Sequence, residues 1–484
     1  MHRSRLLHAL VPTLAGVAIT AVLLHACRED RPTTPPETST AVVGKWSGVL
    51  PAPIVQVHLH LLPNGQVLSW GASGDPQVWS PATGGFTTVP APSWLFCAGH
   101  DFLPDGRLFV AGGHISAHHG LPNVNVFDPA TASWQPAPAM TRGRWYPTAT
   151  TLADGQVLVM GGRDEAGEVV TIPEVWDGSG WRRLTTASLQ TDYYPRTFVA
   201  PDGRVFYAGE DQPSRWLDVS GRGSWTDGPP RNFSGGRGYG SAVMYAPGKV
   251  LYVGGGDPPT NTAETIDLNQ PSPKWAYTGS MAFARRQMDA TLLPTGDVLV
   301  TGGTSGGGFN NPVGAVHAAE LWNPTTGVWT TLASNAVRRI YHSTTLLLPD
   351  GRVLHAGSGG ARHAANERSY ELYSPPYLFR GARPTISGVT PAQVQYGETI
   401  FVGTPDAATI ARVTFIRLGS VTHAANMGQR FVPLSFGQVA GGLSVVVPAR
   451  RTTAPPGPYM LFLVNGDGVP SEARIIRLHD GAGR

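Results

Sequence analysis

Cysteine is scarce in this sequence, which has only Cys27 and Cys97 among its 484 residues. Two cysteines cannot form the framework of several disulfides that holds small extracellular domains together. Charge is scarce as well, because Asp, Glu, Lys and Arg make up 14% of the residues and the formal net charge is +3. No block of basic residues occurs, so we expect no nucleic-acid partner.

Glycine, proline and aromatic residues are abundant instead. The chain contains 60 Gly, 43 Pro, 13 Trp, 14 Tyr and 16 Phe. Glycine and proline favour turns and aromatic residues favour strands, whereas Lys and Glu, which favour helices, are few. The composition therefore predicts an all-β protein of many short strands, and the length allows two or three domains.

The N-terminus has the pattern of an export signal. Arg3 and Arg5 precede an apolar run over residues 9–24 that Pro12 interrupts, which is the order of charged and apolar regions in a secretory signal. A retained membrane span is disfavoured because the run is short and broken. We interpret residues 1–27 as a signal peptide and the Pro/Thr-rich residues 28–43 as a linker. The mature protein is then secreted, periplasmic or on the cell surface.

The end of this segment, Leu24-His25-Ala26-Cys27, resembles the lipobox of bacterial lipoproteins. Cys27 would then carry a lipid that anchors the protein to a membrane. Simple cleavage is the alternative, because His25 is unusual at its position. In either case Cys97 is the cysteine that keeps a free thiol in the mature chain.

Seven copies of a strand–turn–strand unit follow one another. Three of them read LPNGQVLSWG at 62–71, LADGQVLVMGG at 152–162 and LPDGRVLHAGSGG at 348–360. Each copy has a turn glycine, where a tight hairpin needs a positive φ, and these glycines are at positions 65, 106, 155, 203, 248, 296 and 351. A period of 41 to 55 residues with paired glycines and a late Trp is typical of kelch repeats.

Seven kelch units predict a seven-bladed β-propeller with four strands per blade over residues 44–380. One blade is expected to take strands from both ends of this region, which closes the ring without exposed edges. From Arg383 onward the paired glycines stop, while alternating strands continue. Residues 381–484 are therefore expected to form an immunoglobulin-like β-sandwich.

One position of the repeat carries unusually polar and aromatic residues. Nine residues before each turn glycine the sequence has Gln56, Cys97, Tyr146, Tyr194, Tyr239, Gln287 and His342. Tyr is also a good strand residue and a single Cys is often buried, so one such position alone would mean little. Because blades are arranged radially, residues at one phase converge on the axis, which predicts a site there.

Tyr341 stands directly beside His342 in the sequence. Neighbouring residues of a regular strand point to opposite faces. Both side chains can therefore reach the axis only at a strand end, a local twist or a bulge, and bulges are common beside active sites.

Four motifs occur in order along the chain. LFCAGHDFLPDG contains Cys97, GRWYPTATTLADG contains Tyr146, RIYHSTTLLLPDG contains Tyr341 and His342, and VTHAANMGQRFVPL contains His423. With these motifs the chain resembles the galactose oxidase and glyoxal oxidase family of mononuclear radical copper oxidases. The resemblance covers nearly the whole mature chain.

The resemblance implies a copper site. Tyr146 would be an equatorial ligand joined to Cys97 by a thioether bond, His342 and His423 the two imidazole ligands, and Tyr341 the axial tyrosinate. Two imidazoles with phenolate oxygens and an open position suit Cu(II) rather than Zn or Mg. Since His423 belongs to the sandwich domain, a loop of that domain must reach down the channel.

The resemblance also implies a reaction, the oxidation of a primary alcohol or aldehyde by O2 with release of H2O2. Tyr341 would accept the hydroxyl proton as general base, and a Tyr146 radical would abstract hydrogen from carbon. The partners are then a small alcohol, aldehyde or sugar and O2, and we expect a monomer.

This chain departs from galactose oxidase near the thioether. Galactose oxidase covers that bond with a Trp from a segment that here reads Gly161-Gly162-Arg163-Asp164. Tyr239 is expected to be the covering aromatic residue instead, and Tyr194 and Gln287 to contact substrate. The GRWYPT motif favours the glyoxal oxidase and bacterial branch.

Two other functions are compatible with a propeller. A kelch propeller can be a binding module at the cell surface without chemistry, and it would then have little affinity for copper. A propeller glycosidase would need paired carboxylates at the channel phase, where this sequence has none.

Overall fold

The computed structural model describes residues 39–360, 365–391 and 393–479. The predicted signal peptide, and with it Cys27, lies outside these residues. Within the described ranges, no helix is long and apolar enough to cross a membrane. Regular secondary structure in these ranges is almost entirely β-strand, with one short α-helix, α1 (Thr40–Val43), and two short 3-10 helices, η1 (Pro376–Phe379) and η2 (Ala407–Thr409).

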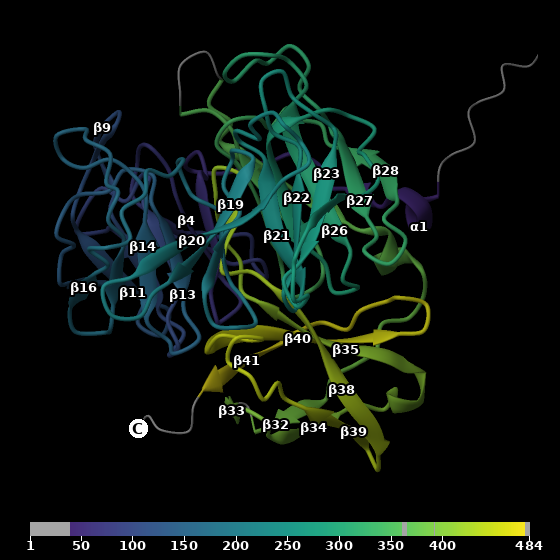
Figure 1. Cartoon of the computed structure of the whole chain (residues 1–484). Coiled ribbons are helices and arrows are strands. Elements are labelled where there is room, and N and C mark those ends of the chain that lie inside the picture. Colours follow the sequence, from purple (N-terminus) through teal and green to yellow (C-terminus); the bar gives the residue numbers. More distant parts are fainter. Residues whose placement is uncertain (1–38, 361–364, 392, 480–484) are drawn as a thin grey trace, which may run out of the picture. The chain divides into compact units, whose positions relative to one another are not determined.

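Seven antiparallel sheets form the blades of a β-propeller, as predicted (Figure 1). The first three blades are β3 (His58–Leu61), β4 (Val67–Trp70), β5 (Gln77–Trp79) and β6 (Phe86–Thr88); β7 (Gly99–Phe102), β8 (Leu108–Ala111), β11 (Val124–Asp128) and β12 (Ser133–Ala137); and β13 (Thr148–Thr151), β14 (Val157–Met160), β15 (Glu174–Trp176) and β16 (Trp181–Arg183). A small hairpin, β9 (His114–Ser116) with β10 (His119–Gly120), extends from the second blade.

The next three blades continue this order. They are β17 (Thr197–Val199), β18 (Val205–Tyr207), β19 (Pro213–Asp218) and β20 (Ser224–Pro230); β21 (Ser241–Ala246), β22 (Lys249–Val253), β23 (Ala263–Asp267) and β24 (Trp275–Tyr277); and β25 (Arg286–Leu292), β26 (Val298–Thr304), β27 (Ala318–Trp322) and β28 (Trp329–Ser334). Apolar side chains fill the space between neighbouring blades, as Phe206, Trp216, Tyr252 and Trp275 do between the fourth and fifth.

The seventh blade closes the ring with strands from both ends of the propeller. β29 (Ser343–Leu347), β30 (Val353–Gly357) and β31 (Ser369–Ser374) come from its C-terminal end. β1 (Lys45–Trp46) and β2 (Leu50–Pro51) come from its N-terminal end and pair with β31. This arrangement confirms the predicted closure.

The seven turn glycines all have the positive φ that the sequence predicted, between 71° and 93°. The paired glycines at the strand ends have a second cause, close contact with the neighbouring blade. A Cβ at Gly357 would lie 2.4 Å from the backbone oxygen of Gln56 and 2.6 Å from that of His342. No side chain fits between strands this close, so glycine is required there.

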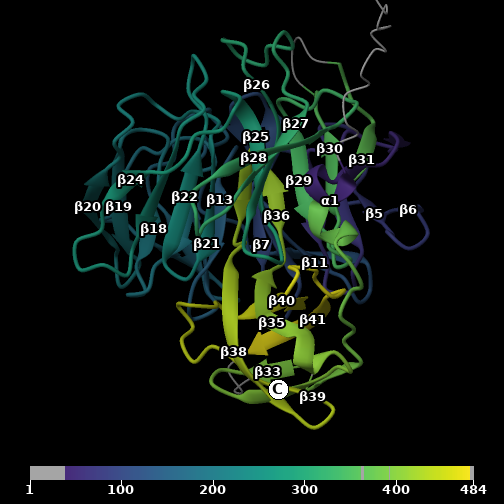
Figure 2. The ribbon, with the colours of Figure 1, turned by 90° about the vertical axis from the view of Figure 1, so that its right-hand side faces the viewer.

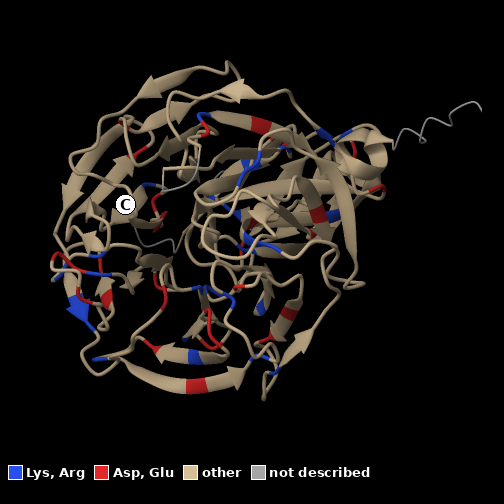
Figure 3. Ribbon diagram, turned by 90° about the horizontal axis from the view of Figure 1, so that it is seen from above, with Lys and Arg blue, Asp and Glu red and all other residues tan. Residues whose placement is uncertain are grey.

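A buried ion pair is repeated in four blades. An arginine before the innermost strand binds a glutamate on the third strand, in the pairs Arg144–Glu174, Arg237–Glu264, Arg285–Glu320 and Arg339–Glu371. Each arginine also donates to the carbonyl of a paired glycine, as Arg285 does to Gly302 at 3.0 Å. Figure 3 views the blades from above with charged residues coloured. These pairs fix the entry of the chain into each innermost strand.

The C-terminal part forms a β-sandwich with its own apolar core, as predicted. Its eight sandwich strands are β32 (Gly388–Thr390), β33 (Gln393–Gln395), β34 (Thr399–Gly403), β35 (Ile410–Arg417), β38 (Phe431–Val439), β39 (Gly442–Val446), β40 (Gly457–Asn465) and β41 (Arg474–His479).

Two further strands leave the sandwich and enter the propeller. β36 (Ser420–Thr422) and β37 (Ala425–Met427) form a hairpin whose first strand pairs with β3, the innermost strand of the first blade. Figure 2 shows β36 among the blades. The turn of this hairpin is His423-Ala424, with φ of 48° and 64°, as a tight two-residue turn requires. The sandwich therefore sends His423 down the propeller axis, as predicted.

Candidate active site

Seven residues stand nine positions before a turn glycine, and six of them have a left-handed backbone at the inner end of a blade. They are Cys97, Tyr146, Tyr194, Tyr239, Gln287 and His342, with φ between 48° and 68°. Such a φ is rare outside glycine and is concentrated at functional sites. At His342 this positive φ interrupts the regular strand, so that the neighbouring side chains of Tyr341 and His342 can both face the axis. Gln56 has no positive φ, and its amide donates to Ser69.

Backbone hydrogen bonds connect these residues from blade to blade. The N–H of Tyr146 donates to the carbonyl of Cys97 at 2.9 Å, and the N–H of Tyr194 donates to that of Tyr146 at 3.0 Å. The N–H of Gln287 donates likewise to Tyr239 at 2.9 Å. The propeller frame itself therefore holds the strained positions in place.

Four side chains meet at one point on the axis. The hydroxyl oxygens of Tyr146 and Tyr341 are 2.5 Å apart. The Nε2 atom of His423 is 2.9 Å from the Tyr146 oxygen, and that of His342 is 3.5 Å from it. All four residues are at most 5% exposed. The structure thus brings together the two phenols and two imidazoles that the sequence predicted.

Both imidazoles are fixed in one tautomer by their outer nitrogens. The Nδ1 atom of His342 lies 2.5 Å from the Gly359 carbonyl, which can only accept. The Nδ1 atom of His423 lies 2.5 Å from the Thr422 hydroxyl, which donates its own proton to Val57. Each Nδ1 therefore carries the hydrogen, and each Nε2 presents a lone pair to the Tyr146 oxygen. Metal-binding histidines are oriented in this way.

Burial controls the protonation of the site. It lowers the pKa of His342 to about 3 and that of His423 well below its usual value, so both imidazoles are neutral at neutral pH. Burial also raises the pKa of Tyr146 and Tyr341 well above the ordinary value. Both phenols therefore keep their protons unless a cation stabilises the anion.

Cys97 is a buried free cysteine that packs with Tyr146 and Trp145. Burial raises the pKa of its thiol, while side-chain hydrogen bonds with Tyr146 and Trp145 lower it. Its backbone N–H donates to Nε2 of His58 at 3.2 Å. The thiol therefore lies against Tyr146 in the protein interior.

Trp145, not Tyr239, covers Tyr146. The two rings are stacked with centroids 3.7 Å apart and planes 11° apart. Tyr239 instead meets Tyr341 edge-on, with centroids 5.5 Å apart. The prediction for Tyr239 was wrong because the left-handed backbone at Tyr146 lets two successive side chains share one side.

A cavity of about 960 Å³ opens above these residues. Of the predicted residues, Tyr146, Tyr239, Tyr341 and His342 line it. Tyr194 and Gln287, the other predicted substrate contacts, do not. Tyr194 is buried against Tyr146 and His423 and donates to the Ala98 carbonyl, and Gln287 is buried as well.

Several lining residues were missed by the sequence analysis. Phe96, Trp145 and Tyr193 stand ten residues before a turn glycine, as the predicted Tyr341 does, and all four line the cavity. The repeat therefore contained a second informative phase beside the first. Trp94 and Phe309, from loops, and His114 and His118, from the β9–β10 hairpin, also line the cavity, but their positions share no phase.

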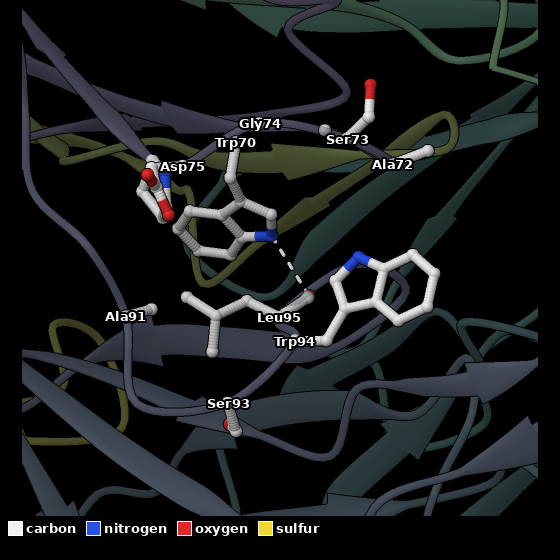
Figure 4. Close-up of a pocket in the computed structure, with 11 residues that line it drawn as sticks. Trp70, Ala72, Ser73, Gly74, Asp75, Ala91, Ser93, Trp94 and Leu95 are labelled. Carbon is white, nitrogen blue, oxygen red and sulfur yellow. Dashed lines mark hydrogen bonds between the residues drawn. The ribbon is translucent and has the colours of Figure 1, made fainter.

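A second cavity of about 460 Å³ adjoins the first, and Ala72 and Trp94 line both. Figure 4 shows Trp94 beside Leu95, whose carbonyl accepts a hydrogen bond from the Trp70 indole at 3.0 Å. Ser73, Asp75 and Ser93 give this second cavity a polar edge.

Fold and site together define a class of protein, a seven-bladed kelch propeller whose axial site is completed by a hairpin of an immunoglobulin-like domain. Three families match: "Galactose oxidase-like, Early set domain" at residues 383–478, "Glyoxal oxidase N-terminus" at 256–377 and "Kelch motif" at 104–141. The comparisons confirm the resemblance to the galactose oxidase and glyoxal oxidase family.

Individual relatives extend over most of the chain. A galactose oxidase of Gibberella zeae is 29% identical over 90% of this chain and 71% of its own length. Aldehyde oxidase GLOX of Vitis pseudoreticulata is 29% identical over 79% of this chain and 82% of its own length. The structure of a fungal alcohol oxidase in complex with copper superposes with a TM-score of 0.83 at 27% identity, over 90% of this chain and 99% of that one.

Proposed function

We propose that this protein is a copper radical oxidase that converts a primary alcohol or aldehyde with O2 and releases H2O2. One observation carries the proposal. The oxygen of Tyr146 is at the meeting point of Tyr341, His342 and His423, while its ring has Cys97 beside it and Trp145 over it.

The donor set fits copper. Two neutral imidazoles offer their Nε2 lone pairs, and two phenols complete a set of nitrogen and oxygen ligands of the kind Cu(II) prefers. Within the described residues, no group of three or more His, Cys, Asp or Glu could hold a metal. The tyrosine oxygens are therefore needed for a complete site.

The chain's own residues account for the rest of the chemistry. Copper, when bound, would supply one of the two oxidising equivalents that the reaction needs. Tyr146, joined to Cys97 by a thioether, would hold the second as a radical and abstract the hydrogen from the substrate carbon. Tyr341 would accept the hydroxyl proton. The balanced reaction is RCH2OH + O2 → RCHO + H2O2.

The surroundings of the site agree with this assignment. Trp145 stacks on the ring that would carry the radical and keeps solvent away from it. Tyr341 opens to the cavity, where a substrate hydroxyl can reach it. We further propose that the protein is exported as a monomer and that Cys27 is either removed or lipidated.

Mass mapping of the thioether tests the proposal. The full chain is loaded with Cu(II) in air and digested with trypsin, which should release residues 46–107 and 145–163. We expect these peptides to be joined, with loss of two hydrogen atoms to copper and O2, and Cys97→Ser to abolish the link. If Cys97 stays open to alkylation and the peptides stay separate, the proposal fails. Oxygen uptake and peroxide release then measure turnover.

A further inference from the structure

The walls of the active-site cavity are largely aromatic. Trp94, Phe96, Trp145, Tyr193, Tyr239 and Phe309 line it. Phe309 meets Tyr341 with ring centroids 4.6 Å apart, and Phe96 meets His342 at 5.5 Å. These apolar rings therefore begin directly beside the residues that would touch the reacting group.

None of the described residues that line the cavity is Asp, Glu, Lys or Arg. Two arginines contact lining residues from outside the lining, Arg163 at Tyr193 and Arg286 at Tyr239. Arg163 donates to the Tyr193 hydroxyl at 2.8 Å and to the Gly167 carbonyl at 2.8 Å. Arg286 binds the Asp257 carboxylate at 2.9 Å. Each guanidinium group is thus held by these partners, and neither residue lines the cavity.

Two imidazoles of the wall also bond to neighbouring side chains. Nδ1 of His114 accepts the Trp145 indole N–H at 3.0 Å, and Nδ1 of His118 lies 3.1 Å from the Tyr193 hydroxyl. A sugar buried here would lose hydration at several hydroxyls and find few partners. An aryl or alkyl group would instead exchange water for aromatic surface.

We propose that the cavity selects aryl and alkyl primary alcohols or aldehydes over sugars, with Trp94 and Phe309 as its specificity-determining residues. This inference rests on the proposed oxidase function. Trp94 and Phe309 are 47% and 48% exposed and both line the cavity, so they stand where a bound substituent emerges. Because Trp94 also borders the second cavity, a long substituent can continue past it.

Turnover by the copper-loaded full chain tests the selection. The substrates are benzyl alcohol and benzaldehyde, hexan-1-ol and hexanal, and, as polar counterparts, galactose and glycolaldehyde. We expect kcat/KM for the better aryl or alkyl substrate to exceed that for either polar compound by about 100-fold, because the aromatic wall would stabilise its transition state better. Equal or higher kcat/KM for galactose would overturn the inference.

Two variants locate the selection in the cavity. Phe309→Ala and Trp94→Ala should each lower kcat/KM for the aryl substrate about tenfold, as expected for the loss of one aromatic contact. Turnover of glycolaldehyde, which has no aryl or alkyl group to pack against these rings, should change less than twofold by the same reasoning. The matched control is Phe401→Ala, since Phe401 is 42% exposed on β34 of the sandwich. Equal losses for both substrates would contradict the assignment.

Binding separates this inference from the oxidase proposal. If the copper-loaded chain turns over none of the substrates, the oxidase proposal fails, and calorimetry with benzyl alcohol decides the cavity's preference. Saturable binding that Phe309→Ala weakens and Phe401→Ala does not would still support an apolar site. Absence of binding, or equal binding of galactose, would overturn it.

Discussion

His423 depends on its neighbour Thr422 for its orientation. The Thr422 hydroxyl donates to Val57 at 2.9 Å and accepts from Nδ1 of His423. This leaves Nε2 free to face the Tyr146 oxygen. One buried hydroxyl group therefore fixes both the tautomer and the direction of a proposed copper ligand.

Thr422→Val should weaken copper binding while leaving the fold intact. Valine keeps the shape but removes the hydrogen bond, and loss of such a supporting partner lowers metal affinity by about 10- to 100-fold. Competition with a chelator of known affinity measures the change. Thr150→Val is the matched control, because Thr150 is also buried and hydrogen-bonds Thr197 in another blade. Equal copper affinity in the two variants would argue against the role of Thr422.

The residue scale also shows where sequence reasoning stops. The repeat phase correctly brought Cys97, Tyr146 and His342 to the axis, because the period fixes which positions are equivalent. It did not reveal that these positions have a left-handed backbone, which is why Trp145 was missed as the cover of Tyr146. A side chain's direction depends on φ, and φ is not encoded in residue spacing.

At the scale of the elements, four blades share the same buried ion pair between an arginine and a glutamate. The Arg285–Glu320 pair is fully buried, with an N–O distance of 2.5 Å, and Arg285 also donates to the carbonyls of Gly302 and Ala318. Glu320 additionally accepts the N–H of Ala282. The pair thus ties the innermost strand of the sixth blade to its third strand.

Glu320→Ala should destabilise the protein strongly. It leaves the Arg285 charge buried without its carboxylate, and breaking such a pair costs about 3–5 kcal/mol. Urea unfolding followed by tryptophan fluorescence measures the loss. Asp227→Ala is the control, since its pair with Arg215 lies at the surface, where Asp227 is 89% exposed, and its loss should change stability by less than about 1 kcal/mol. Similar losses in both variants would contradict the importance of burial.

Blade count and ring closure were predictable at this scale, because each turn glycine marks one blade and an unpaired edge strand must be covered. The irregular loops were not. Phe309 and Trp94 reach the cavity from segments without period or alternation, so their position follows from packing between blades rather than from any local pattern.

At the scale of the whole molecule, a chain of buried histidines joins the propeller to the inserted hairpin. Nδ1 of His58 lies 3.0 Å from Nε2 of His100, and the Ser420 hydroxyl of β36 bonds Nδ1 of His100 at 2.7 Å and of His60 at 2.9 Å. Burial lowers the pKa of His100 to about 3 and lowers those of His58 and His60 as well.

These buried histidines make the stability of the fold sensitive to acid. At neutral pH these histidines are uncharged in both states, but below the ordinary pKa of about 6.5 the unfolded chain binds protons that the folded protein excludes. The free energy of unfolding should therefore fall as pH drops from 6.5 towards 3, by about 1.4 kcal/mol per pH unit for each histidine.

His100→Gln should make the free energy of unfolding fall less steeply with pH, by up to about 1.4 kcal/mol per pH unit, because one titrating histidine is removed. Urea unfolding between pH 7.5 and 4.5 gives the slope for wild type and variant. Thr345→Val, which removes a buried hydrogen bond with Thr301 but no titrating group, should shift the curve without changing its slope. Identical slopes in wild type and His100→Gln would count against the histidine chain as a source of acid sensitivity.

The threaded hairpin has a consequence for how the protein is made. Cys97 and Tyr146 belong to the first third of the chain, whereas His423 lies near its end, on the turn of a hairpin that pairs with β3 of the first blade. A nascent chain therefore cannot gather the four donors, however much of the propeller has formed. The proposed metal site can therefore be complete only when the last domain is in place, so that the proposed oxidation cannot begin in an unfinished molecule.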